Sequence, residues 1–376
     1  MRSSSEKKLI ILIIIVILVV LAISGFILYA FLGNGNDSLQ NDMNFMMYND
    51  ELSRVPIVTG NNITQNTVVA VENVENNQSQ TPVSTTTDTS KYYYNQLSDT
   101  AKKIYDQLKE HKEDMKTGTY EIDFNTEFNN ILSTEDGEET LNEEYQSAWN
   151  AFSYDNVDLF YLDISKISMT IETRTDGGTT TYYVKIGPGD YSSYLSSTFA
   201  NKQEIEDAEA YIEDIRNQVM AILGPYDNAM KIKVVNEWMI DNLSYEDREG
   251  NNNKYNLYGA IVETKVVCEG YARMFKYIMD GLDIPCILVS GTATNSEGTT
   301  ELHAWNYVEL NSQWYAIDVT WNDPVVIGGG ELTDSQKSKY LLKGKSFLED
   351  HEEDGMISEN SMEFTFPKLN SADYIF

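Results

Sequence analysis

Cysteine, basic residues and histidine are all scarce in this chain of 376 residues, and each scarcity argues against a class of protein. The two cysteines, Cys268 and Cys286, form no C-x-x-C motif, which argues against a disulfide-stapled scaffold and a cysteine-type zinc site. Lysine and arginine together number 27 against 59 acidic residues, which gives a net charge of −32. Because a field of that sign repels phosphate backbones, we expect no nucleic-acid partner.

The three histidines narrow the search for a catalytic base to one residue. His111 lies in a run of charged residues, which predicts a solvated surface position. His351 lies among the acids of 349–354, which predicts a protonated side chain far from the apolar framework. An imidazole that activates a cysteine would therefore be His303.

A long apolar run near the start of the chain predicts the compartment. Residues 9–32 carry no charge, and a helix of that length would measure about 36 Å, enough to cross a membrane. A cleaved signal peptide is the alternative, but its apolar core has about 7–15 residues, and 31–36 lacks a small-residue cleavage motif. Basic residues precede the run, so we expect a single-pass anchor in the cell membrane, with 1–8 cytoplasmic and everything after the span extracytoplasmic.

The chain beyond the span is predicted to begin with a flexible linker at 33–90. This stretch is rich in Asn, Ser, Thr and Gln and cannot bury enough apolar surface to offset the entropy of ordering. Residues 91–200 are then predicted to form a small α+β domain, in which we find no group of chemically reactive residues. The expected elements are helices at 97–108 (N-cap Ser98 or Asp99) and 139–152, and strands at 120–124, 158–164, 168–174 and 179–186.

The last region, 201–376, shows helical patterns first and strand patterns after them, which is typical of an α+β fold. The expected helices cover 202–222 and 229–242, with a third that begins at Cys268, and the expected strands cover 286–291, 303–310 and 313–320. A thiol at a helix N-terminus meets unpaired N–H groups and about half a unit of positive charge, which favour the nucleophilic thiolate. Cys286 lies in an apolar strand and is expected to act as a small buried hydrophobe.

His303 and Asp318 are predicted to be neighbours on a β-hairpin. A two-residue loop joins the last two strand patterns, and if Leu310 pairs with Gln313, then Trp305 faces Asp318. His303 and Asp318 are then diagonal neighbours on one face, about 7–8 Å apart between Cα atoms. A carboxylate there would fix the tautomer of the imidazole and support its protonated form. A structural His–Asp hydrogen bond is the alternative reading.

Three motifs together resemble the transglutaminase-like superfamily on the papain-related fold: Val-Cys-Glu-Gly-Tyr-Ala at 267–272, His-Ala-Trp-Asn at 303–306 and Tyr-Ala-Ile-Asp-Val-Thr-Trp at 315–321. The resemblance covers roughly 215–342 and implies a nucleophile helix packed on an antiparallel sheet. It also implies Cys268 as nucleophile, His303 as general base and acid, and Asp318 as the orienting carboxylate. One departure is Lys-Val-Val at 265–267, where many members carry glycines.

The expected function is extracytoplasmic, cysteine-dependent acyl transfer on protein or peptide amides, ending in either transamidation or hydrolysis. The expected partners are a protein or peptide substrate at the cell surface and the membrane, with no cofactor and no metal. The backbone N–H of Cys268 is a natural oxyanion donor, and Asn256, Tyr258 and Trp238 are candidates for the second. The alternative is a non-catalytic cell-surface binding or scaffolding protein that keeps the same fold.

Overall fold

The computed structural model describes residues 58–61, 87–246, 250–324 and 332–376. The predicted cytoplasmic N-terminus, the predicted transmembrane helix at 9–32 and most of the predicted linker lie outside these residues. Within the described ranges, no helix is both long enough and apolar enough to cross a membrane.

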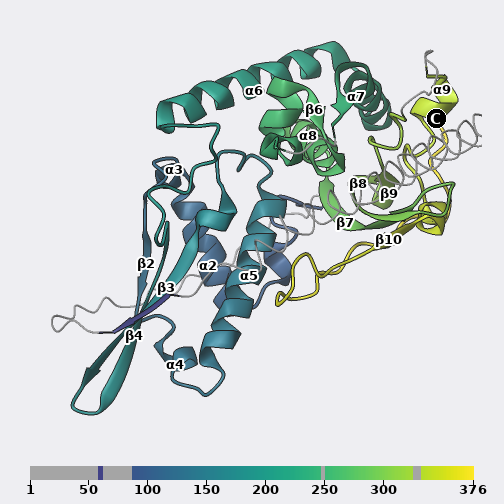
Figure 1. Ribbon diagram of the computed structural model, residues 1–376. Coiled ribbons are helices and arrows are strands. Elements are labelled where there is room, and N and C mark those ends of the chain that lie inside the picture. Colours follow the sequence, from purple (N-terminus) through teal and green to yellow (C-terminus); the bar gives the residue numbers. More distant parts are fainter. Residues whose placement is uncertain (1–57, 62–86, 247–249, 325–331) are drawn as a thin grey trace, which may run out of the picture. The chain divides into compact units, whose positions relative to one another are not determined.

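A long hairpin organises the first part of the fold (Figure 1). Strand β3 (Ser168–Asp176) pairs with β4 (Thr179–Gly187) over its whole length, around a Gly-Gly turn with positive φ at both glycines. Strand β2 (Ile122–Asn125) joins β4, and β1 (Val58–Asn61) joins β3, which gives the order β1-β3-β4-β2. The predicted linker at 33–90 thus contains a strand, because the outer edge of β3 offers unpaired backbone groups.

Helices α2 (Asp99–Glu110) and α5 (Gly137–Asp155) pack together beside this sheet and confirm the two helices predicted here. Ser98 is the N-cap of α2, and its side chain accepts a hydrogen bond from the Ala101 N–H at 3.0 Å. This region also contains two single-turn helices, α3 (Lys112–Met115) and α4 (Asn129–Leu132), and a 3-10 helix at Tyr94–Gln96.

The predicted strand at 158–164 was wrong. These residues form turns that lead into a 3-10 helix at Ile164–Lys166. The consecutive side chains of Leu159, Phe160 and Tyr161 are all buried. A strand sends neighbouring side chains to opposite faces, so this apolar run reaches the core as a folded loop instead.

The second part of the fold places a helix on an antiparallel sheet, which confirms the α+β class. Helices α6 (Lys202–Leu223) and α7 (Asn228–Asn242) begin at the capping side chains of Asn201 and Asp227. Helix α8 (Cys268–Gly281) packs on the sheet, mainly against β8 and β7. The strands here are β7 (Cys286–Thr294), β8 (Thr300–Leu310), β9 (Gln313–Ile317), β10 (His351–Glu353) and the small parallel pair β5 (Ser244–Tyr245) and β6 (Lys265–Val266). The shorter helices are α9 (Asp334–Lys337), 3-10 helices at Asn252–Tyr255 and Lys345–Glu349, and a π-helix at Gly259–Glu263.

The sheet has the order β10-β7-β8-β9, and its last hairpin has the register predicted from the sequence. Leu310 pairs with Gln313, and the same register continues to the pair Asn306–Ile317. Strand β10 was not predicted. It pairs antiparallel with the other edge of β7, where His351 lies opposite Ala293.

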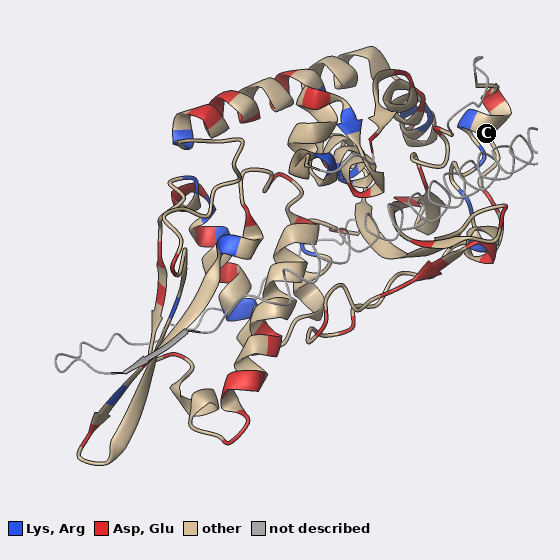
Figure 2. Ribbon diagram, in the orientation of Figure 1, with Lys and Arg blue, Asp and Glu red and all other residues tan. Residues whose placement is uncertain are grey.

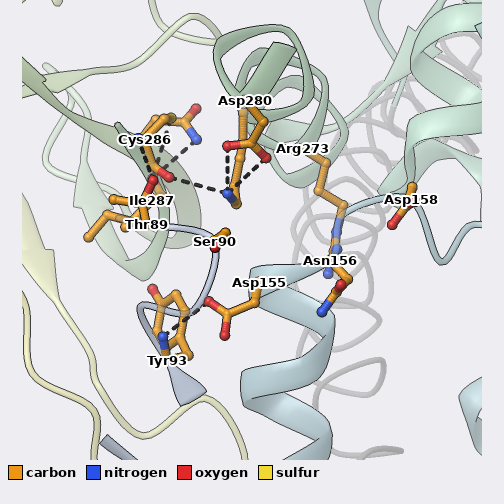
Figure 3. Close-up of polar contacts among 12 residues, drawn as sticks. Thr89, Ser90, Tyr93, Asp155, Asn156, Asp158, Arg273, Asp280, Cys286 and Ile287 are labelled. Carbon is orange, nitrogen blue, oxygen red and sulfur yellow. Dashed lines mark hydrogen bonds and ion pairs between the residues drawn. The ribbon is translucent and has the colours of Figure 1, made fainter. Parts of the chain in front are cut away.

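One buried apolar core runs across the domain boundary predicted at residue 200, and the division at that point stays a prediction. The segment that precedes α2 lies against β7 (Figure 3). Its Thr89 side chain accepts a hydrogen bond from the Cys286 N–H at 3.2 Å, and the Tyr93 hydroxyl donates to the Leu288 carbonyl. The Tyr93 N–H donates to Asp155 at the end of α5, and burial raises the pKa of that carboxyl to about 6.

Candidate active site

Cys268 is the first residue of α8, at the helix end that presents unpaired backbone N–H groups. The helix forms here because apolar side chains from Ala272 to Met279 recur at helical spacing and are buried. The cysteine itself is a free thiol with 5% of its surface exposed. The predicted helix start is therefore confirmed.

A glycine near the cysteine lets α8 approach the preceding loop closely. A Cβ atom at Gly270 would lie 2.5 Å from the Val266 Cβ and 2.7 Å from the Lys254 carbonyl oxygen. The same carbonyl accepts a hydrogen bond from the Val267 N–H at 3.1 Å. The loop that leads into Cys268 is thus fixed against the first turn of the helix.

A buried ion pair stands next to the cysteine. Glu269 and Arg273 are 2.7 Å apart, and their side chains are 2% and 5% exposed. Burial raises the pKa of Glu269, and the guanidinium opposes that rise. Arg273 also reaches from α8 toward α5 (Figure 3). There its guanidinium donates a hydrogen bond to the Ser153 carbonyl at 3.0 Å. The first part of the fold thereby helps to hold the start of the cysteine helix.

His303 and Asp318 meet as the hairpin register predicts. The histidine lies on β8, the aspartate directly follows β9, and His303 Nε2 is 2.8 Å from Asp318 Oδ2. Both residues are buried. The other carboxylate oxygen, Oδ1, accepts a hydrogen bond from the Trp321 N–H at 3.1 Å, and the Asp318 N–H donates to the Tyr340 carbonyl. The carboxylate is therefore held at both of its oxygens.

Charge makes His303 a strong base. Burial alone would lower the pKa of His303, but the charge and hydrogen bond of Asp318 outweigh it and, with a contribution from Cys268, raise the pKa to about 10. Burial acts in the opposite sense on Asp318, yet the charges and hydrogen bonds of His303 and His351 hold its pKa well below the usual range. At neutral pH the pair is an imidazolium beside a carboxylate.

Cys268 contributes to the raised pKa of His303, which places its side chain close to the imidazole. Since Asp318 engages Nε2, the ring atom left for the thiol is Nδ1. The fold thus brings together the three residues selected from the sequence, although their catalytic roles stay predictions.

The expectation that His351 lies far from the apolar framework was wrong. Its side chain has no exposed surface, and its ring stacks on Phe347 with centroids 3.9 Å apart. Its Nε2 lies 3.3 Å from Asp318 Oδ2, the same oxygen that contacts His303. The acid-rich surroundings predicted a position far from the apolar framework. Instead, β10 pairs with β7, and this pairing places the ring of His351 next to Asp318. The sequence did contain one signal that this segment is buried. Phe347, four positions before His351, is an apolar aromatic residue that is expected to be buried.

The cluster of His303, Asp318 and His351 brings three potential metal ligands within 4.8 Å of one another. Its geometry is that of a hydrogen-bond network. Both Nε2 atoms approach one carboxylate oxygen, so the two rings converge on an atom. Zinc would instead need its ligand atoms to surround a common point about 2 Å from each of them.

The three candidates for a second oxyanion donor make other contacts in the structure. The Asn256 side-chain oxygen accepts a hydrogen bond from the Gly259 N–H, and the Tyr258 ring packs against Phe160 and Phe199. Trp238 is a partly buried residue of α7 that packs against the core.

Residues 216–319 match the sequence model of the transglutaminase-like superfamily, a range that contains Cys268, His303 and Asp318. The predicted resemblance is confirmed for this part of the chain, which matches the transglutaminase-like model. Among curated proteins, the kyphoscoliosis peptidases of mouse and human are similar to it. The mouse protein is 24% identical over 141 residues, which cover 32% of this chain and 20% of the relative. The human protein is 23% identical over 191 residues, which cover 44% and 28%. The chain thus spans between a fifth and a third of the length of these relatives.

Two solved structures share this similarity at low identity. One is a crystal structure of a TGase, 16% identical, with a TM-score of 0.29 and coverage of 46% of this chain and 50% of the other. The second is a putative cysteine protease from Cytophaga hutchinsonii, 14% identical, with a TM-score of 0.24 and coverage of 41% and 64%.

Proposed function

We propose that the protein is a cysteine-dependent acyl-transfer enzyme that acts on protein or peptide amides, with Cys268, His303 and Asp318 as its catalytic triad. The observation that carries the proposal is the position of His303. One of its ring nitrogens is hydrogen-bonded to Asp318 at 2.8 Å, and the ring lies close to Cys268. A buried imidazolium beside a thiol stabilises the thiolate, which is the nucleophilic form.

In the first half of the reaction, the Cys268 sulfur attacks the amide carbonyl carbon and a C–S bond forms. The negative oxygen that develops lies at the start of α8, where the N–H groups of the helix favour it. His303 gives its proton to the leaving nitrogen, the C–N bond breaks, and a thioester remains on the enzyme.

In the second half, an acceptor attacks the thioester carbon while neutral His303 takes the proton of the acceptor. Water as acceptor releases a carboxylic acid, and an amine as acceptor yields a new amide. In both cases the Cys268 thiolate returns next to the His303 imidazolium. The word peptidase in the names of the similar mouse and human proteins supports amides as the substrate class and hydrolysis as one outcome.

The test is to trap the thioester. Full-length protein is incubated with an acyl donor at neutral pH, quenched in acid, and examined for an acyl adduct by mass spectrometry. We expect the adduct on Cys268 in the wild type and in Cys286→Ala, and none in Cys268→Ala. Cys286 is a matched control because burial raises the pKa of its thiol far above the ordinary value, which keeps it unreactive. Absence of an adduct on Cys268 would refute the proposal and favour the alternative of a binding or scaffolding protein.

A labelled amine then distinguishes the two outcomes of the reaction. Incorporation of the label into a glutamine-containing protein would indicate transamidation, and release of free acid without incorporation would indicate hydrolysis. His303→Ala should abolish either product, since the same imidazole serves both halves of the reaction.

We also propose that the enzyme is anchored in the cell membrane with its folded part outside. The apolar run at 9–32 and the basic residues before it support this topology. Protease added to intact cells should release a fragment of about the size of the folded part. Full protection of that part would refute the topology.

A further inference from the structure

His351 occupies the far side of the candidate triad, and both of its ring nitrogens face carboxylates. Nε2 lies 3.3 Å from Asp318 Oδ2, and Nδ1 lies 2.7 Å from Asp350 Oδ1. An ionised carboxylate can only accept a hydrogen bond, so each contact calls for an N–H on the ring. Only the imidazolium form donates from both nitrogens. The arrangement therefore suits an imidazolium between two carboxylates.

The surrounding residues hold this ring in one orientation. Phe347 stacks on one face, and Trp321 and Tyr340 pack around it with centroids 4.6 and 5.4 Å away. Strand β10 comes close enough only because residue 291 is a glycine. A Cβ at Gly291 would lie 1.9 Å from the Glu352 carbonyl oxygen.

Asp318 needs such a neighbour at one stage of acyl transfer. Its side chain has no exposed surface, and burial by itself favours the neutral carboxyl. While His303 is protonated, the two charges compensate each other. Once His303 has given its proton to the leaving group, the buried carboxylate would stand without a partner charge and would tend to capture a proton.

We propose that His351 is a positioning residue for the acyl-transfer reaction: its N–H groups and positive charge keep Asp318 ionised and aimed at His303 while His303 is neutral. The assignment rests on the proposed function and adds a fourth side chain to its triad. Because two cations share one carboxylate, His351 also makes His303 release its proton more easily, which supplies the neutral base needed in the second half-reaction.

The two rings face each other with centroids 5.6 Å apart, and each also faces charged groups of the described residues. His303 is faced by Asp318 from the end of β9 and by Cys268 from α8. His351 is faced by Asp318 and by Asp350, whose Oδ2 also accepts a hydrogen bond from the Tyr340 hydroxyl at 2.8 Å. Both Asp318 and Asp350 would favour the protonated form of His351.

Asp350 lines a cavity of about 520 Å³ at the edge of the sheet. The cavity wall also includes Glu349, Glu352 and Glu353, and the Tyr340 hydroxyl accepts a hydrogen bond from Lys339 on the same side. His351 therefore lies between a buried triad and an acidic cavity.

The first arm of the test needs no turnover. Histidine-selective isotope labelling of the full-length protein gives few NMR signals, and the signal of His303 is the one lost in His303→Gln. In His351→Phe, which keeps an aromatic ring in the stack, we expect His303 to lose its proton about 1 pH unit higher than in the wild type. At pH 10 its protonated fraction should rise from about half to about nine-tenths.

Two further variants separate charge from packing. His351→Gln keeps an N–H donor toward Asp318 but no charge, and should show the same shift. His111→Phe is the matched control, because His111 pairs with Asp114 at 3.0 Å on the surface, and it should leave the titration of His303 unchanged.

The second arm follows the acyl-enzyme in time. At pH values below the pKa of His303, breakdown of the thioester should be about tenfold slower in His351→Phe than in the wild type, because the neutral form of His303 becomes about tenfold rarer. Formation of the thioester should change less, so the acyl-enzyme accumulates. A variant with only a folding defect would show a smaller burst with unchanged rate constants.

An unchanged or lowered titration of His303 in both His351 variants overturns the assignment. If the wild type forms no thioester but the titration moves upward, the proposed function fails while His351 still positions Asp318. The two failures are thus distinguishable.

Discussion

Replacement of Asp318 by asparagine removes the negative charge beside His303 while it leaves the size of the side chain unchanged. In the wild type the pKa of about 10 keeps His303 about 99% protonated at pH 8. Without the carboxylate, burial lowers the pKa and the smaller contribution of Cys268 opposes it, so the pKa should return to about 6.5. The protonated fraction at pH 8 then falls to about 3%, a change of about 30-fold.

The measurement is the same histidine-selective NMR titration, carried out on wild type, Asp318→Asn and Asp114→Asn. The last variant is a control in which the other His–Asp contact, between His111 and Asp114, loses its charge at the surface. We expect the His303 signal to titrate near pH 10 in the wild type and in the control, and at least three units lower in Asp318→Asn. Thioester formation at pH 8 should fall by about the same 30-fold. A His303 that stays protonated at pH 8 in Asp318→Asn would show that the carboxylate is not the source of its basicity.

Three other changes probe the site and its support. The raised pKa of His303 contributes stability that is fully present below about pH 6.5 and is lost as the pH rises to about 10. The free energies of unfolding of wild type and His303→Gln should therefore differ by at most about 5 kcal/mol at low pH and should converge over that window. Gly291→Ala should cost about 1–3 kcal/mol in urea unfolding and displace β10, whereas Gly187→Ala, whose Cβ would come closer than 3 Å only to a side-chain atom of Glu121, should cost less. Arg273→Met leaves Glu269 buried without its cation and should cost about 3–5 kcal/mol at pH 7; a loss under about 1 kcal/mol would contradict the importance of that pair.

The part of the site that could be predicted is the part encoded by local pattern. The helix start at Cys268 follows from apolar spacing, and the neighbourhood of His303 and Asp318 follows from a two-residue loop that fixes the register of the hairpin. Both depend on residues within about twenty positions of one another.

The part that could not be predicted depends on pairing across long stretches of chain. His351 reaches Asp318 because β10 pairs with β7, and no local pattern records which edge a three-residue strand will join. In the sequence, the acidic neighbours of His351 predicted an exposed position and outweighed the apolar signal of Phe347. The closeness of β10 requires Gly291, a residue that by itself reads only as a break in a strand.

The overall charge shows the same division between composition and placement. Acidic residues lie along α6, α5 and the segment around β10 (Figure 2), as the net charge of −32 leads one to expect. Composition did not reveal that Glu269 and Asp318 are buried beside basic side chains. Glu269 follows Cys268 in the chain, and Asp318 contacts His303.

The attachment of the segment at Thr87–Tyr93 has a mechanical consequence. Its hydrogen bonds go to the Cys286 N–H and the Leu288 carbonyl of β7 and to the Glu309 side chain of β8. Strand β7 separates the strand that carries one imidazole from the strand that carries the other. The segment Thr87–Tyr93 is therefore tied to the strand that lies between the two imidazoles, so a displacement of this segment would act first on the middle of the sheet.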